Sequence, residues 1–124
     1  MCTMKRIAVT SEGPSLDDRM DPRFGRAAGF VVVDLETLDT HYIDNGSSQV
    51  MSQGAGIQAA ELIARAGVSC LLTGYVGPKA FQALSAAGIQ VGHKLEGVTV
   101  REAVERFKSG QVEMAQSANW GAGQ

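Results

Sequence analysis

Short apolar runs separated by polar breaks divide the first 45 residues of the chain. Three runs, at 6–10, 30–34 and 38–43, have the length of strands, and the third alternates between polar and apolar positions. Clusters of glycine, serine, proline and asparagine, which favour turns, follow the first and third runs. The pattern predicts three strands, and the short gap between the second and third predicts a hairpin.

The apolar positions change to helical spacing after residue 54. Three helical stretches are predicted; Pro78 suits the first turn of the second, and Thr99 with Glu102 forms a capping box that starts the third. A glycine suited to a helix C-terminus follows each stretch: Gly67, Gly88 and Gly110. The apolar runs at 68–73 and 89–92, between the helices, predict two buried strands.

The order of these elements is β-β-β-α-β-α-β-α, which predicts an α/β fold with a mixed five-stranded sheet. Strand–helix–strand crossovers give parallel strands, whereas the hairpin contributes the antiparallel part. The length favours a single domain over residues 1–110. Residues 111–124 are small and polar apart from Trp120, so we expect a flexible C-terminal tail there.

The composition narrows the classes of partner. Of the 124 residues 44% are hydrophobic, and the net charge of −2 argues against a general nucleic-acid binder. No run approaches the roughly 18 apolar residues of a membrane span, and no signal-peptide pattern is present. We therefore expect a cytoplasmic chain without a nucleic-acid or membrane partner.

Cys2 and Cys70 are the only cysteines. Cys70 lies inside an apolar run and is expected to be a buried free thiol. Two cysteines so placed do not supply the four thiolates that usually hold an iron–sulfur cluster.

Three loops rich in glycine or arginine carry the candidate chemistry. They are Met-Asp-Pro-Arg-Phe-Gly-Arg at 20–26, inside a polar loop at 14–29, Gly-Ala-Gly at 54–56 and Gly-Tyr-Val-Gly at 74–77. The last two precede helices, at the sheet edge where ligands of such folds bind. Unpaired N–H groups at helix N-termini and arginine guanidinium groups both favour an anion.

The candidate binding residues lie in these loops or directly beside them: Met20, Arg23, Phe24, Arg26, Met51, Gln53, Gly54, Ala55, Gly56, Gly74, Tyr75 and Gly77. No catalytic residue and no side chain bonded to a metal is expected among them.

Each loop also has a plainer interpretation. The glycine pairs suit ordinary turns before helices, and aspartates at 17, 18 and 21 can pair with the arginines of their own loop. Met20 and Met51 offer soft thioether contacts but also suit gap filling in a core. Tyr75 can contact a ligand or cover the sheet edge, and His41 and His93 suit surface or capping positions.

The ordered set of segments Ile7-Ala8-Val9, 21–26, 54–56, 74–77 and Ala87-Gly88-Ile89 resembles the dinitrogenase iron–molybdenum cofactor biosynthesis family, which includes NifX and the C-terminal part of NifB. The resemblance implies a ribonuclease H-like three-layer fold and a non-covalently bound metal–sulfur cluster. The small free-standing members look most similar, which implies a molybdenum–copper sulfide cluster, with an iron–molybdenum cofactor precursor as the alternative. Many members have a histidine before Gly-Ala-Gly, where this chain has Gln53, so a histidine-ligated cluster is not expected at that position.

Three functions of different classes follow from these features. The favoured one is a carrier or assembly scaffold for an anionic metal–sulfide cluster, with protein partners in a cytoplasmic complex. The second is a nuclease, which needs several carboxylates around two metals; the first predicted strand has none, and Glu12 and Asp34 are the nearest. The third is a protein-partner module without its own cofactor, regulating redox or cell-division machinery.

Overall fold

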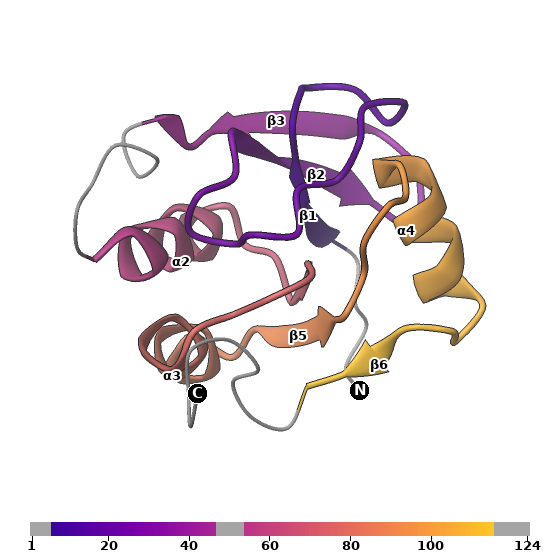
Figure 1. The fold of residues 1–124 in the computed structure, drawn as a ribbon. Coiled ribbons are helices and arrows are strands. Elements are labelled where there is room, and N and C mark those ends of the chain that lie inside the picture. Colours follow the sequence, from indigo (N-terminus) through magenta and orange to yellow (C-terminus); the bar gives the residue numbers. More distant parts are fainter. Residues whose placement is uncertain (1–5, 47–53, 116–124) are drawn as a thin grey trace.

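The structure is a computed structural model that describes residues 6–46 and 54–115, drawn in Figure 1. The strands are β1 (Arg6–Ser11), β2 (Gly29–Asp34), β3 (Thr40–Asp44), β4 (Cys70–Leu72), β5 (Gln90–His93) and β6 (Glu113–Met114). The helices are α2 (Ala55–Arg65), α3 (Pro78–Ala86) and α4 (Val100–Lys108). The predicted order of elements is confirmed as far as α4.

All the strands belong to one mixed sheet in the order β3-β2-β1-β4-β5-β6. The β1, β4 and β5 strands are parallel, whereas β2 runs antiparallel to both β1 and β3. Consequently β1, β3, β4 and β5 all end at the same edge of the sheet, which we call the carboxyl edge. The loops after β1 and β4 are hydrogen-bonded to each other at this edge, where the sequence placed the loops entering the helices, and the first turns of α2 and α3 lie in contact.

Helices cover both faces of the sheet: α2 and α3 lie on one face and α4 on the other (Figure 1). The alternation of β1 explains how one strand serves both layers. Ala8 points into the core beneath α2 and α3, while Ile7 and Val9 point into the core beneath α4. This arrangement gives three layers, helix–sheet–helix; the ribonuclease H-like fold that the family resemblance implied stays a prediction.

The prediction of five strands was wrong, because β6 adds a sixth. It pairs antiparallel with β5 through Gly92↔Met114 and His93↔Glu113. A Cβ atom on Gly92 would lie 2.5 Å from Val112 Cγ1, so the absence of a side chain lets this segment close over the sheet. Residues 113–114 of the predicted tail therefore belong to the sheet, and Trp120 lies outside the described residues.

The helix boundaries follow the predicted signals. Pro78 is the first residue of α3, and Gly67, Gly88 and Gly110 have φ angles of 74°, 77° and 76° that L side chains rarely adopt. The Thr99 hydroxyl accepts a hydrogen bond from the Glu102 N–H in a complete capping box. No helix among the described residues is long and apolar enough to cross a membrane.

Cys70 is fully buried, as predicted, and its thiol is free. Burial raises the pKa of Cys70 to about 12, so the thiolate that binds metals is disfavoured. Cys2 lies outside the described residues.

Candidate functional site

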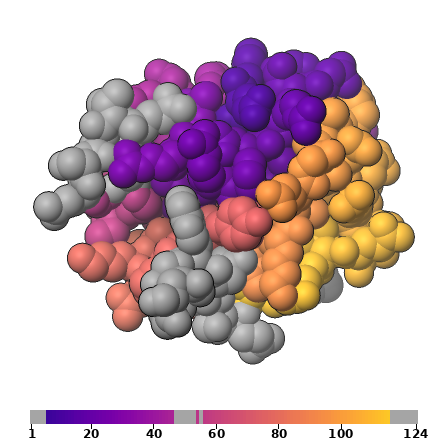
Figure 2. All heavy atoms as spheres, in the orientation of Figure 1, coloured from indigo at the N-terminus to yellow at the C-terminus, as the bar shows by residue number. Residues whose placement is uncertain are grey.

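Two of the predicted loops are hydrogen-bonded to each other at the carboxyl edge. The Tyr75 N–H donates to the Pro22 carbonyl at 2.7 Å, and the Phe24 N–H donates to the Tyr75 carbonyl at 3.3 Å. Gly74 permits this approach, because a Cβ atom there would lie 2.6 Å from Pro22 Cβ. Figure 2 shows the purple loop after β1 lying across this face against the salmon segment after β4.

The Arg23 guanidinium is held by a neighbouring carboxylate. Arg23 Nε and Nη2 donate to Asp21 Oδ1 and Oδ2, both at 3.1 Å, and the Arg23 N–H donates to Oδ1 at 2.9 Å. Hydrogen bonding to Asp21 raises the pKa of Arg23. Asp21 is buried, but the Arg23 side chain is 55% exposed, so part of its fork faces solvent. The internal Asp–Arg pairing weighed above is therefore present for Arg23.

The other aspartates of this loop serve different partners. Asp17 accepts a hydrogen bond from Arg101 Nε at 3.2 Å, and Asp18 accepts one from the Ser15 N–H at 2.8 Å. Hydrogen bonds thus hold the loop at several points along its length, so the backbone that carries Arg23 is fixed in place.

The N-termini of α2 and α3 lie side by side without side-chain caps. Gly54, with φ 76°, precedes α2, and Gly77 precedes α3; neither helix has an acidic residue in its first turn. The two first turns touch, since a Cβ atom on Gly56 would lie 2.8 Å from Ala80 Cβ. Both N-termini therefore present partial positive charge at one place.

The first-turn N–H groups at this place have no partner within the described part of the chain. No hydrogen bond from the Gly56, Ile57, Lys79 or Ala80 N–H is found there, whereas the next donor in α3, the Phe81 N–H, bonds to the Gly77 carbonyl. Donors left this way at a helix N-terminus suit an anionic ligand.

Two candidate side chains belong to the core rather than to the loop surface. Met20 is 2% exposed and packs in the core under α4; Phe24 is 1% exposed and packs against Phe30, with ring centroids 5.7 Å apart. This placement favours gap filling for Met20 and leaves neither side chain at the surface of the loop.

The remaining candidates are placed as follows. The Tyr75 hydroxyl donates to Glu96 Oε1 at 3.2 Å, and this bond raises the pKa of Tyr75. The Arg26 N–H donates to the Arg23 carbonyl at 3.3 Å. Ala55 is the first residue of α2. The predictions on Met51 and Gln53 lie outside the described residues.

Sequence reasoning missed polar side chains buried at the ends of the strands and behind the loop. Thr10 and Thr73 are fully buried, and His93, for which the sequence suggested a surface or capping position, is only 7% exposed. Each directly follows apolar residues of a parallel strand, which is the signal that could have found them. Asn45, also fully buried, holds the backbone of the arginine loop: its Nδ2 donates to the Ala27 carbonyl at 3.0 Å.

The side chains of the described residues form no evident binding site for a single metal ion. No group of three or more histidine, cysteine, aspartate or glutamate side chains able to hold one is found in 6–46 and 54–115. What the carboxyl edge offers is backbone N–H donors and a guanidinium group, the chemistry of anion binding.

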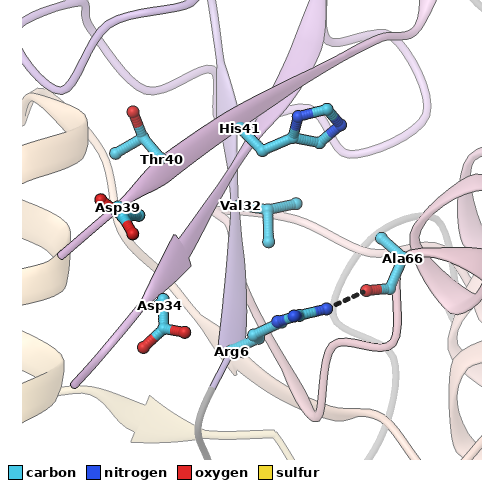
Figure 3. A pocket seen from close by; sticks show the side chains of 7 residues that line it. All are labelled: Arg6, Val32, Asp34, Asp39, Thr40, His41 and Ala66. Carbon is cyan, nitrogen blue, oxygen red and sulfur yellow. Dashed lines mark hydrogen bonds between the residues drawn. The ribbon is translucent and has the colours of Figure 1, made fainter. Parts of the chain in front are cut away.

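A separate pocket of about 400 Å³ lies at the opposite edge (Figure 3). Arg6 begins β1, and its Nη1 donates at 3.5 Å to the carbonyl of Ala66, where α2 ends. Figure 3 shows Asp34, Asp39 and Thr40 on the side away from Ala66. Charges of both signs line this pocket, so it lacks the convergent donors of the carboxyl edge.

The chain matches the protein family described as "Dinitrogenase iron-molybdenum cofactor" over residues 4–110. It is also similar to an uncharacterized protein of Methanocaldococcus jannaschii, with 31% identity over 103 residues that span 81% of this chain and 86% of that protein.

Two solved structures are similar over almost the whole chain. One is the apo form of the orange protein from Desulfovibrio gigas, with 65% identity, a TM-score of 0.92 and coverage of 96% of this chain and 99% of that one. The other is an NMR structure of a putative NifB protein from Thermotoga, assigned to the DUF35 family, with 31% identity, a TM-score of 0.83 and coverage of 96% and 100%.

Proposed function

The chain belongs to the dinitrogenase iron–molybdenum cofactor family, which confirms the resemblance, and from this premise we propose that it binds an anionic metal–sulfide cluster non-covalently. The cluster is cargo: the chain acts as its carrier or assembly scaffold in the cytoplasm, and not as an enzyme. We propose a molybdenum–copper sulfide cluster, with an iron–molybdenum cofactor precursor as the alternative. Protein partners that deliver or receive the cluster are part of the proposal, whereas nucleic acid and membranes are not.

One observation carries this proposal: the 65% identity to the orange protein over nearly both whole chains. The solved form of that protein is described as apo, which implies that it also has a loaded form. At such identity the loops at the carboxyl edge are expected to serve the same kind of ligand in both chains.

The geometry suits a cluster whose metals already carry their own ligands. In a thiometalate cluster sulfide already surrounds the metals, so the protein needs only to bind the outer sulfur atoms and balance their charge. The N–H groups at the first turns of α2 and α3 supply hydrogen-bond donors on one side of the proposed site. The Arg23 guanidinium supplies positive charge beside them. The buried, protonated thiol of Cys70 takes no part.

The proposed contacts are the loop residues themselves: Arg23, Arg26, Gly54, Ala55, Gly56, Gly74, Tyr75 and Gly77, with Met51 and Gln53 between β3 and α2. Met20 and Phe24 act indirectly, because they anchor the arginine loop to the two cores.

Anaerobic isolation followed by visible absorption and analysis for molybdenum, copper, iron and sulfide tests the function. We expect charge-transfer bands and a stoichiometric metal content, either as isolated or after reconstitution with tetrathiomolybdate and copper. The variant Cys2→Ser/Cys70→Ser should reconstitute like the parent chain. A chain that neither carries nor takes up metal would leave the partner-binding function in place of this one.

A further inference from the structure

Two arginine–aspartate pairs of the loop after β1 have similar arginines and very different aspartates. The side chains of Arg23 and Arg101 are 55% and 54% exposed. The partner of Arg101 is Asp17, whose side chain is 79% exposed and accepts one hydrogen bond, from Nε at 3.2 Å. The partner of Arg23 is Asp21, whose side chain is 5% exposed and accepts from Nε, from Nη2 and from the backbone N–H. The chain thus buries one carboxylate beneath an arginine that stays at the surface.

Stability alone does not explain the burial of Asp21. Burying a carboxylate costs free energy, and the attraction within an ion pair often fails to offset that cost. All the hydrogen bonds that this carboxylate accepts within the described part of the chain come from Arg23, so it neither caps a helix nor joins two elements there. What the pair does provide is a fixed position for the guanidinium group.

That position is set by the sheet. The Asp21 N–H donates to the Thr10 carbonyl at 3.0 Å, and the Asp21 carbonyl accepts from the Thr10 hydroxyl at the end of β1. The backbone of Arg23 forms a parallel bridge with Tyr75 in the loop after β4. Hydrogen bonds from two neighbouring strand ends therefore hold both members of the pair, and few rotations of the arginine side chain stay free.

The pairing geometry leaves one edge of the guanidinium open. A guanidinium carries five N–H groups in one plane. Asp21 accepts from Nε and Nη2, which lie on one side of that plane. Nη1 and the second hydrogen of Nη2 form the adjoining edge, which has no partner among the residues that the structure describes. Two N–H bonds run parallel along this edge, and such a fork suits an anion that offers two adjacent acceptor atoms.

We propose that Asp21 is a positioning residue for cluster binding: it holds Arg23 so that the Nη1–Nη2 edge donates to two sulfides on one metal of the cargo. This inference rests on the proposed function and deepens it, because it states which part of the cluster the arginine recognises. The Asp21 carboxylate repels an anion from the Nε side and leaves the outer edge accessible. The contact consists of hydrogen bonds to sulfur, so every metal keeps its sulfide ligands.

The variant Asp21→Asn separates orientation from charge, because the two act in opposite directions. It removes one negative charge beside the site, so charge alone would strengthen the binding of an anion. Losing the carboxylate also frees the guanidinium, and we therefore expect cluster affinity to fall about two- to tenfold, the cost of ordering one long side chain. Titration with copper(I) and tetrathiomolybdate, followed by visible absorption, measures it. Asp17→Asn is the matched control: the same change of charge at an exposed carboxylate of the same loop should not lower affinity.

The variant Arg23→Lys makes the complementary change, since it keeps the charge and removes the planar fork. We expect about a tenfold loss of affinity, equal to one charge-assisted hydrogen bond.

Spectra of the arginine side chains report the positioning directly. In ¹H–¹⁵N spectra of the parent chain the Arg23 Nε–H should exchange slowly with water before loading, because Asp21 accepts it. Loading should shift the Arg23 Nη signals more than the Nε signal, and the Arg101 signals should stay in place. In Asp21→Asn the Arg23 Nε–H should exchange rapidly.

The outcomes separate this inference from the function beneath it. If the parent chain takes up the cluster but Asp21→Asn binds it equally well or better, the inference is overturned and the proposed function stands. Arg23 Nη signals that do not move on loading overturn it as well. If no cluster binds to the parent chain, both fail. Should Asp21→Asn not fold, Arg23→Lys and the spectra of the parent chain still decide.

Discussion

The helices α2, α3 and α4 all begin at the carboxyl edge, but the chain closes one N-terminus and leaves two open. At α4 the Val100 N–H donates to the Asp18 carbonyl at 2.9 Å and the Arg101 N–H to the Leu16 carbonyl at 2.8 Å, and the capping box binds a third donor. At α2 and α3 glycines occupy the N-cap positions and no side chain caps either helix.

The loop after β1 contacts both kinds of helix N-terminus, and its two parts differ in what they do there. Residues 16–20 of this loop run along the start of α4 and accept hydrogen bonds from its first N–H groups. Residues 21–26 turn to the other side and lie on the loop before α3. Donors that a fold leaves unpaired are the ones a ligand can use. We therefore expect the α4 side of the edge to contribute stability and the α2/α3 side to bind the ligand.

The largest effect is expected from closing the open side sterically. Gly56→Val places a branched side chain where even a Cβ atom lies 2.8 Å from Ala80 Cβ, so α2 and α3 must separate. We expect a loss of about 1–3 kcal/mol in the free energy of unfolding, measured with urea, and more than a tenfold loss of cluster retention, measured by visible absorption.

A matched control exchanges the methyl groups of the two helices. In Gly56→Ala/Ala80→Gly the new Cβ atom meets only the Cα atom of residue 80, at 3.8 Å, an ordinary contact. This double variant should retain the cluster. Full retention by Gly56→Val would remove the helix contact from the site.

Removing the guanidinium group comes next. Arg23→Ala deletes one charge-assisted donor, a loss of about 1.5 kcal/mol or more, so we expect cluster affinity to fall about tenfold. The buried Asp21 carboxylate also loses its partner, and the thermal midpoint falls modestly. Lys108→Ala, at the far end of α4, is the control for a general charge effect. A lower midpoint with unchanged affinity would mean that Arg23 serves the loop alone.

At the capped N-terminus of α4, a substitution should lower stability without lowering cluster affinity. Thr99→Ala removes the side chain that caps α4 and is expected to lower the free energy of unfolding by about 1 kcal/mol, measured with urea. Cluster affinity should stay within error of the parent chain. A clear loss of affinity in this variant would erase the distinction between the two sides.

The smallest expected effect is on how the thermal midpoint falls at acid pH. Hydrogen bonding from His93, and then from Lys94, lowers the pKa of Glu113 from its usual 4.5. A carboxylate with a lowered pKa stabilises the folded chain above its unfolded pKa, and that contribution disappears as the pH falls through the folded value. The thermal midpoint of Glu113→Gln should therefore decline less steeply below pH 4.5 than that of the parent chain. Equal slopes would show that the contact does not stabilise β6.

Much of the scaffold could be predicted because local signals coincide with it. Apolar periodicity marks the strands and helices, and Thr99 with Glu102 marks the start of α4 unambiguously. The glycine loops could be assigned to the carboxyl edge because that edge follows from the parallel order.

The rest depends on contacts between distant segments. The β6 strand has only two residues and forms because β5 offers a free edge and Gly92 leaves room. Met20 and Phe24 lie in a polar loop by sequence, yet the fold uses both to fill its cores. The pairing of His93 with Glu113 joins residues that no local pattern connects.

The most direct test of the two-sided edge is a ¹H–¹⁵N spectrum recorded before and after loading with copper(I) and tetrathiomolybdate. We predict that the N–H signals of Gly56, Ile57, Lys79 and Ala80 shift strongly, because their donors face the bound sulfides. The N–H signals of 100–102 should stay in place, because the chain already binds them. Shifts concentrated at 100–102, with the first turns of α2 and α3 unchanged, would contradict the account.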